Sequence, residues 1–153
     1  MLQQRLCDRE PLHPDALMLA GPVTLLGDAL HAMIPSLGQG ACCALEGALE
    51  LAQCIAAAAT VEAADASAQP ELLREALRSY EVARLARSTT IQTRSAHAGA
   101  AAYGKGKEAQ TPADAAAAAG PAQAAVRPED FMAWLHDYRS PHAELDAVLL
   151  QRT

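Results

Sequence analysis

The chain has 153 residues, which is enough for one ordinary domain with a modest hydrophobic core. Its formal net charge of -6 argues against a surface that binds nucleic acid or anionic membranes. Aromatic residues make up only 3% of the sequence, so we expect a core of mainly Ala and Leu. Such a core favours the packing of helix on helix over a large sheet.

The four cysteines, Cys7, Cys42, Cys43 and Cys54, show neither a CxxC spacing nor a secretory context. We expect all four to be reduced, with the last three packed on or near a helix face. No uninterrupted apolar run reaches the roughly 18 residues that span a bilayer, and the N-terminus shows no signal-peptide pattern. The sequence therefore predicts no transmembrane segment.

The most informative stretch covers residues 21–55. Its first part, Val23–Leu26, is rich in strand-forming residues and predicts a short buried strand. A turn with Pro35, Gly38 and Gly40 follows, and a long apolar helix is predicted from Gly40 to about Thr60. A helix that begins at a glycine-rich turn is suited to an anionic or electron-rich ligand.

Two sets of side chains define the predicted faces of the helix at 40–60. The apolar face is expected to contain Leu45, Leu49, Leu51, Ala52 and Ile55. Glu46 and Glu50 lie one turn apart and are expected on the wetter side. Gly47 lies inside the helix, where it is unfavourable relative to Ala, and we expect it to permit close helix packing.

A second helix is predicted to begin at Pro70 and to end at Gly104–Gly106. One of its faces is expected to carry Leu73, Leu77, Tyr80, Arg84 and Arg87. On this predicted surface helix, Glu81 is placed to pair with Arg84 or Arg78.

Residues 104–127 are expected to form a low-complexity Ala/Pro/Gly linker, and residues 128–153 a short helical tail. The tail helix is predicted to begin at Pro128, and a second short helix to restart at Ser140–Pro141. The face of the tail helix is expected to carry Phe131, Trp134, Leu135 and Tyr138.

Several of these residues stand in a pattern that resembles a known family. The pattern consists of VTLLGDALHAM at 23–33, Pro35, GQGA at 38–41 and ALE at 44–46. It is similar to the second flavin-contacting signature of the FAD-dependent aromatic-ring hydroxylase and epoxidase family, also called group A flavin monooxygenases. Asp8–Pro11 resembles the lead-in to that strand, and Tyr80–Arg87 resembles the family's following helix. Within the family, the sequence most resembles the plant-type zeaxanthin epoxidases.

The resemblance implies a fold class: mainly α with a short strand, as the C-terminal portion of the α/β FAD-binding monooxygenase fold. Residues 1–103 would form this portion. The family's GxGxxG fingerprint, which binds the ADP half of FAD, has no counterpart in the sequence, so the N-terminal dinucleotide-binding unit is expected to be lacking. The chain also departs from the family at Gly47, where Asp is frequent, and at Leu30, where Ala is usual.

The resemblance also implies the cofactor, FAD, with NAD(P)H as reductant. Asp28 would accept hydrogen bonds from the ribityl hydroxyls, and the loop at 35–40 would wrap the isoalloxazine edge. The N–H groups of Gly40 to Cys42 would face the ring, where reduced flavin carries negative charge. The predicted cofactor-binding residues are Gly27, Asp28, Pro35, Gly38, Gln39, Gly40 and Ala41. No catalytic residue is assigned, because the oxygen-inserting chemistry belongs to the flavin.

Other interpretations of the same residues are weaker. We expect His31 to fix the loop through hydrogen bonds rather than to act chemically. Asp28 and His31 have no third metal ligand near them in sequence, so no metal site is predicted. Cys42, at a helix start, could be a reactive thiol, but a packed small residue is the expectation.

Two functional hypotheses follow. In the first, the chain is the FAD-binding segment of a monooxygenase that epoxidises or hydroxylates a hydrophobic ring substrate, with carotenoids as one candidate. In the second, it is a non-catalytic fragment or helical interaction module that cannot hold FAD alone. We expect the purified chain not to retain flavin through gel filtration. A plastid location follows only from the epoxidase resemblance, and a cytoplasmic one is expected otherwise.

Overall fold

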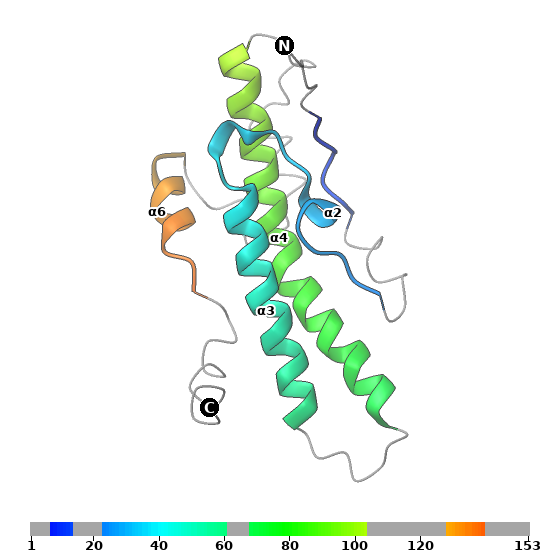
Figure 1. The fold of residues 1–153 in the computed structure, drawn as a ribbon. Helices are drawn as coiled ribbons and strands as arrows, with labels where there is room; N and C mark the ends of the chain where they lie inside the picture. The colour runs from blue at the N-terminus through cyan, green and yellow to red at the C-terminus, as the bar shows by residue number, and fades with distance from the viewer. Residues whose placement is uncertain (1–6, 14–22, 61–67, 104–127, 140–153) are drawn as a thin grey trace.

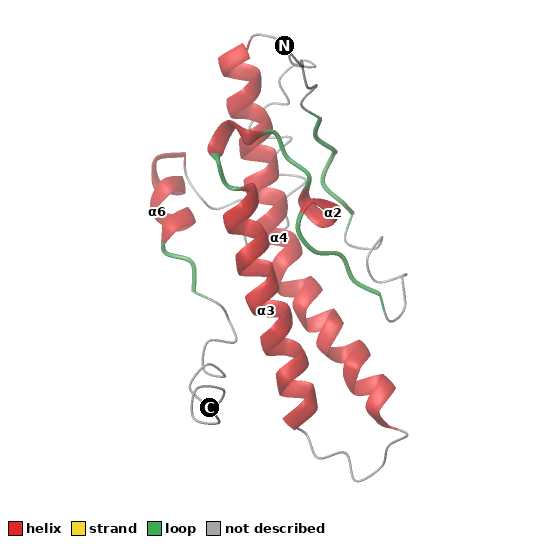
Figure 2. Ribbon diagram, viewed as in Figure 1, coloured by secondary structure: helices red, strands yellow, loops and turns green. Residues whose placement is uncertain are grey.

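The computed structural model describes residues 7–13, 23–60, 68–103 and 128–139. This part of the chain consists of the helices α2 (Asp28–His31), α3 (Gly40–Thr60), α4 (Gln69–Tyr103) and α6 (Phe131–His136), with the 3-10 turns η1 (Pro35–Leu37) and η3 (Pro128–Asp130). The long helices α3 and α4 lie side by side (Figures 1 and 2). In the view of Figure 1, α2 and α6 lie on opposite sides of this pair.

Both long helices begin where the sequence predicts. α3 starts at Gly40, and α4 starts at Gln69, so that Pro70 stands in its first turn, where the missing N–H of proline costs no helical hydrogen bond. The tail helix also begins at Pro128, with η3 followed by α6. The predicted end of the second helix at 104–106, the linker at 104–127 and the second tail helix lie outside the described residues.

The predicted buried strand at Val23–Leu26 is wrong. These residues have no regular secondary structure, and the side chains of Val23 and Leu26 are 55% and 38% exposed. A strand forms only where a neighbouring strand pairs with its main chain, and among the described residues none does. The segment is instead tied to α4, because the Tyr80 hydroxyl donates a hydrogen bond to the Leu25 carbonyl at 3.0 Å.

The predicted orientation of α3 is wrong for most of the apolar face, although Leu51 does pack against the buried cluster of Cys54, Ala76 and Tyr80. Glu50 is fully buried against α4, whereas Leu45 is 73% exposed and Leu49 is 50% exposed. The reason is that α4 presents two buried arginines, Arg84 and Arg87, to α3. Opposite these arginines, α3 places carboxylates rather than leucines, since buried guanidinium groups require hydrogen-bonded partners of opposite charge.

Two glycines mark places where segments approach closely. At Gly47, which is buried, a Cβ would lie 3.0 Å from Leu26 Cδ1 and 3.5 Å from the Tyr80 hydroxyl, so the predicted close packing is confirmed. At Gly99, in α4, a Cβ would overlap the end of Ile34 and lie 2.7 Å from Ser36 Oγ. The loop before α3 therefore rests directly on the backbone of α4.

The tail helix α6 is anchored by aromatic and aliphatic packing. Phe131 and Leu135 are buried against Cys43 of α3 and Ile91 of α4. Met33 and Leu37, from the loop before α3, pack against the same cluster. The tail is thus in contact with the segment that carries most of the predicted cofactor-binding residues.

One helix among the described residues, Gly40–Ala59 within α3, is long and apolar enough to cross a membrane by length and composition, with a mean hydropathy of 1.4. The prediction of no transmembrane segment rests on uninterrupted apolar runs, and two glutamates interrupt this helix. Its length and hydropathy are weak evidence for a membrane span, because core helices of soluble proteins share them. Its two carboxylates, Glu46 and Glu50, face the arginines of α4.

Candidate functional site

An open hollow of about 580 Å³ lies at the start of α3. It is lined by Asp28, Met33, Pro35, Gly38, Gly40, Ala41 and Ala44. Five of the seven predicted cofactor-binding residues are in this lining. The other two flank it: Gly27 precedes α2, and Gln39 accepts the first main-chain hydrogen bond of α3, from Cys43 N–H at 2.9 Å. The fold thus brings all seven residues together.

The turns that shape this hollow need glycine at two positions. Gly27 has φ 59° and Gly38 has φ 64°, and no other described residue has a positive φ. Gly38 closes η1 by donating its N–H to the Pro35 carbonyl at 3.1 Å. A side chain is strained in this region of backbone space. A Cβ on Gly38 or Gly40 would meet no atom within 4 Å, so the backbone here borders open space that a ligand can occupy.

The start of α3 offers main-chain donors to this space. Because the first helical hydrogen bond runs from Cys43 to Gln39, the N–H groups of Gly40, Ala41 and Cys42 have no acceptor within the helix. The helix dipole adds a partial positive charge at the same end. Asp28, in the first turn of α2, lines the hollow as an exposed carboxylate. A ligand that offers hydroxyl donors to the carboxylate and an electron-rich edge to the N–H groups therefore matches this arrangement.

His31 is buried and is not among the residues that line this hollow. Its side chain is 1% exposed, and its Nδ1 has no hydrogen-bond partner. Burial lowers the pKa of the imidazole, because the charged form is poorly solvated, and the positive charge of Arg84 acts in the same direction. Nδ1 contributes no hydrogen bond to the loop, and a loop-fixing role of the imidazole stays a prediction. The main chain of the residue does hold the turn, because His31 N–H donates to the Gly27 carbonyl at 2.9 Å.

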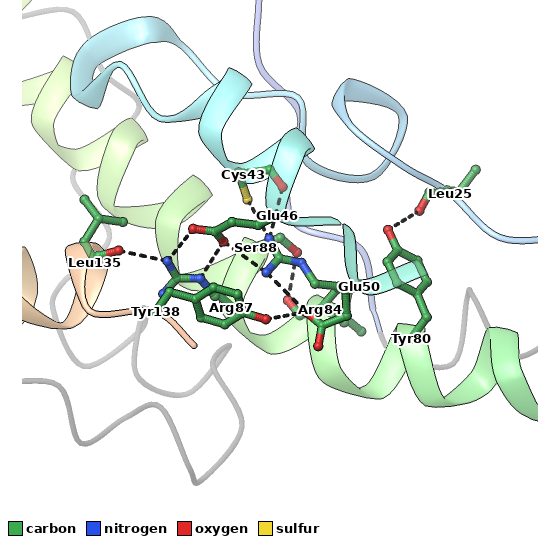
Figure 3. A network of polar contacts seen from close by, with 11 residues as sticks. Leu25, Cys43, Glu46, Glu50, Tyr80, Arg84, Arg87, Ser88, Leu135 and Tyr138 are labelled. Atoms are coloured by element: carbon green, nitrogen blue, oxygen red, sulfur yellow. Dashed lines mark hydrogen bonds and ion pairs between the residues drawn. The ribbon is translucent and has the colours of Figure 1, made fainter. Parts of the chain in front are cut away.

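A buried polar network joins α3, α4 and the tail beside the hollow (Figure 3). Arg87 binds Glu46 with two hydrogen bonds of 2.8 Å, from Nε to Oε2 and from Nη2 to Oε1. Arg84 donates to Glu46 Oε2 at 3.0 Å and to the Cys43 carbonyl at 3.1 Å. Its Nη1 also lies 3.7 Å from Glu50 Oε2. The predicted pairing of Glu81 with Arg84 or Arg78 is wrong, because Arg84 turns to α3 and Arg78 lies 3.9 Å from Glu75.

The network determines the ionisation of its members. Burial works to raise the pKa of Glu46, but the hydrogen bonds and charges of Arg87 and Arg84 outweigh it and hold that pKa below its usual value. Burial raises the pKa of Tyr80 to about 12. The pKa of Tyr138 is likewise raised to about 12. The larger cause is burial, and the second is the hydrogen bond that its hydroxyl donates to Glu50. Near neutral pH Glu46 is therefore ionised, and Tyr80 and Tyr138 are neutral.

Aromatic rings of the tail cover the arginines of this network. The Arg87 guanidinium carbon lies 4.1 Å from the centroid of the Tyr138 ring and 4.6 Å from that of Trp134. Arg87 also donates to the Leu135 carbonyl at 3.0 Å. Sequence reasoning missed these contacts. The recurrence of Arg84 and Arg87 in step with Leu77 and Tyr80 was the available signal, because it places both arginines on the buried face.

All four cysteines are free thiols, and they differ in whether they are buried. Cys43 and Cys54 are buried, as predicted, and burial raises the pKa of both thiols. Cys42 is exposed, so the expectation that it packs on the helix is wrong. Within the described ranges no three His, Cys, Asp or Glu side chains gather as metal ligands would.

Comparison with known proteins gives one matching family model, the FAD binding domain, which matches residues 16–95. The chain is 46% identical over 71 residues to chloroplastic zeaxanthin epoxidase from Solanum lycopersicum, covering 46% of this chain and 10% of that protein. It is 35% identical over 136 residues to 3-hydroxybenzoate 6-hydroxylase 1 from Aquipseudomonas alcaligenes, covering 86% of this chain and 28% of that protein.

A third relative is aurachin C monooxygenase/isomerase from Stigmatella aurantiaca, which is 44% identical over 57 residues. That alignment covers 37% of this chain and 14% of the relative. In these comparisons the chain thus spans between a tenth and about three tenths of the length of its curated relatives. No solved structure gives a significant match.

Proposed function

The chain belongs to the FAD-binding domain family of FAD-dependent hydroxylases and epoxidases. We propose that it forms the ribityl and ring side of the FAD site in a flavin-dependent monooxygenase. The observation that carries the proposal is the hollow at the start of α3, which collects Asp28, Pro35, Gly38, Gly40 and Ala41 around free main-chain donors.

The residues of the hollow suit this cofactor. The Asp28 carboxylate accepts hydrogen bonds from the vicinal hydroxyls of a ribityl chain. The N–H groups at the start of α3 stabilise negative charge on the ring by about 1 kcal/mol, and by more where water is excluded. Gly38 and Gly40 leave the space that a flat ring requires, since no Cβ intrudes. When bound, the flavin supplies the redox chemistry with O₂, and none of these side chains needs to act as an acid or base.

The finer parts of the proposal rest on the relatives. We propose NAD(P)H as the reductant from the family resemblance alone. We propose a ring compound as the substrate, because the names of two relatives contain ring compounds, the hydrophobic zeaxanthin and the aromatic acid 3-hydroxybenzoate. Epoxidation and hydroxylation are both open on this basis. A plastid location would apply if the chain shares the setting of the chloroplastic relatives.

A second candidate function is that of a helical interaction module that does not hold FAD by itself. The observation that favours it is the exposed apolar face of α3, on which Leu45, Leu49 and Ile55 are 73%, 50% and 40% exposed. Such a face is typical of a surface that another polypeptide covers. The two functions differ in one property, which is whether the hollow itself binds flavin.

The Asp28→Asn variant tests the first function. Asparagine keeps the shape of the side chain but removes the charge that strengthens its hydrogen bonds to hydroxyl groups, so we expect the Kd for FAD to rise about tenfold. The measurement is a titration of FAD fluorescence with the full chain at concentrations high enough for weak binding. Asp137→Asn, at an exposed position outside the hollow, is the matched control and should leave the Kd unchanged. Equal affinities for Asp28→Asn and the wild type would contradict the proposal.

A further inference from the structure

The loop between Asp28 and Pro35 is held mainly by side chains from outside it, together with a main-chain hydrogen bond from Arg9 N–H to the Ala32 carbonyl at 3.4 Å. The helix α2 is a single turn, so the carbonyl groups at its end have no helical N–H to accept from. Two of these carbonyls accept from one side chain: Arg9 Nη2 donates to the Ala29 carbonyl at 2.7 Å and to the Leu30 carbonyl at 2.8 Å. The residues that hold the loop are therefore found elsewhere in the sequence.

α4 supplies the other donors. Gln92, 3% exposed, donates from Nε2 to the Ala32 carbonyl at 2.8 Å and to the Arg9 carbonyl at 2.6 Å. Ser95, fully buried, donates from Oγ to the Ile34 carbonyl at 2.6 Å. Gln92 thus joins the loop to the N-terminal segment, because it binds the carbonyl groups of both Ala32 and Arg9.

We propose that Arg9, Gln92 and Ser95 are positioning residues for the flavin, and we call them the carbonyl clamp. The clamp fixes the loop at 29–34, which joins the two halves of the hollow: Asp28 on one side and the helix start at Gly40 on the other. It thereby sets the separation between the carboxylate that would hold the ribityl chain and the N–H groups that would face the ring. No residue of the clamp lines the hollow itself.

This inference rests on the proposed function for its ligand, but the clamp has a consequence that can be measured without flavin. Gln92→Met keeps the length of the side chain and removes both hydrogen bonds. We expect amide hydrogen exchange in residues 29–34 to become at least about tenfold faster, while exchange in α3 stays as in the wild type. Gln92→Glu replaces the donor with an acceptor that faces two carbonyls. In this variant, amide hydrogen exchange in residues 29–34 should therefore be faster still.

A second readout tests the positioning role. In the fluorescence titration with FAD, Gln92→Met should raise the Kd about tenfold, although residue 92 does not touch the hollow. Arg78→Gln, which alters an exposed pair on the same helix, is the matched control and should change neither exchange in the loop nor the Kd.

The outcomes separate the two proposals. Unchanged exchange in residues 29–34 of Gln92→Met would overturn the clamp. Faster exchange with a wild-type Kd for FAD would overturn its positioning role. If the wild-type chain gives no FAD signal at any concentration, the proposed function fails for this chain, and the exchange experiment still decides whether the clamp holds the loop.

Discussion

Replacing Arg84 with methionine is expected to lower the free energy of unfolding by about 3–5 kcal/mol, which is the typical cost of removing one partner from a buried ion pair. Arg84 is 1% exposed and lies between Glu46 and Glu50 of α3. Methionine fills much of the same volume, so the loss comes from the charge and the hydrogen bonds. Glu50, itself fully buried, would be left without this nearby guanidinium.

Urea unfolding followed by circular dichroism measures this effect, with Arg74→Met as the matched control. Arg74 pairs with Glu71 at 2.9 Å on the exposed side of the same helix, where ion pairs contribute about 0–1 kcal/mol. We therefore expect the control to keep nearly the stability of the wild type. Equal stabilities of Arg84→Met and Arg74→Met would show that the buried network does not hold α3 against α4.

Replacing Phe131 with alanine is expected to detach the tail helix. Phe131 is 6% exposed and belongs to the cluster that joins α6 to Cys43 and Ile91. Truncating a buried phenylalanine costs about 3–5 kcal/mol. A helix of six residues has no stability of its own to offset that loss.

The single tryptophan of the chain reports this change directly. Trp134 stacks on Phe131 with ring centroids 5.7 Å apart and also covers Arg87. We expect its fluorescence emission to move to longer wavelength in Phe131→Ala, while the helical signal of α3 and α4 remains. Met132→Ala, at a neighbouring position that is 54% exposed, should keep the wild-type emission. A wild-type spectrum for Phe131→Ala would refute the anchoring role of Phe131.

The helix starts and the site residues could be predicted from local sequence, because their signals are local. Pro70 and Pro128 stand in the first turn of the elements that they begin. The glycine-rich signature placed Gly27, Gly38 and Gly40 at one site, and two of them need the positive φ that only glycine adopts readily. Their contact with FAD stays a prediction.

The packing of α3 could not be predicted in the same way. A periodicity argument places glutamates outside and leucines inside, and here Glu46 and Glu50 point inward. The cause is a pair of arginines about 40 residues further along the chain, on a separate helix. The strand prediction at Val23–Leu26 failed for a related reason, since a strand depends on a pairing partner that the local sequence does not contain.

The carbonyl clamp could not be predicted from the sequence either. Its acceptors are main-chain carbonyls at Ala29, Leu30, Ala32 and Ile34, and any residue type provides such an acceptor. Only the donors can be seen in the sequence, as an arginine before the signature and a glutamine and a serine on α4. These three residue types have too many other roles for their presence to predict this one.

Binding of the ribityl and ring part of a flavin in the hollow at the start of α3 can be tested by amide chemical-shift mapping of the full chain. The two ligands are riboflavin, which lacks the ADP portion of FAD, and ADP alone. We expect riboflavin to shift the amides of Asp28 and Gly38–Ala41, and ADP to leave them in place. Shifts of these amides by ADP and not by riboflavin, or riboflavin shifts confined to other parts of the chain, would contradict binding in the hollow.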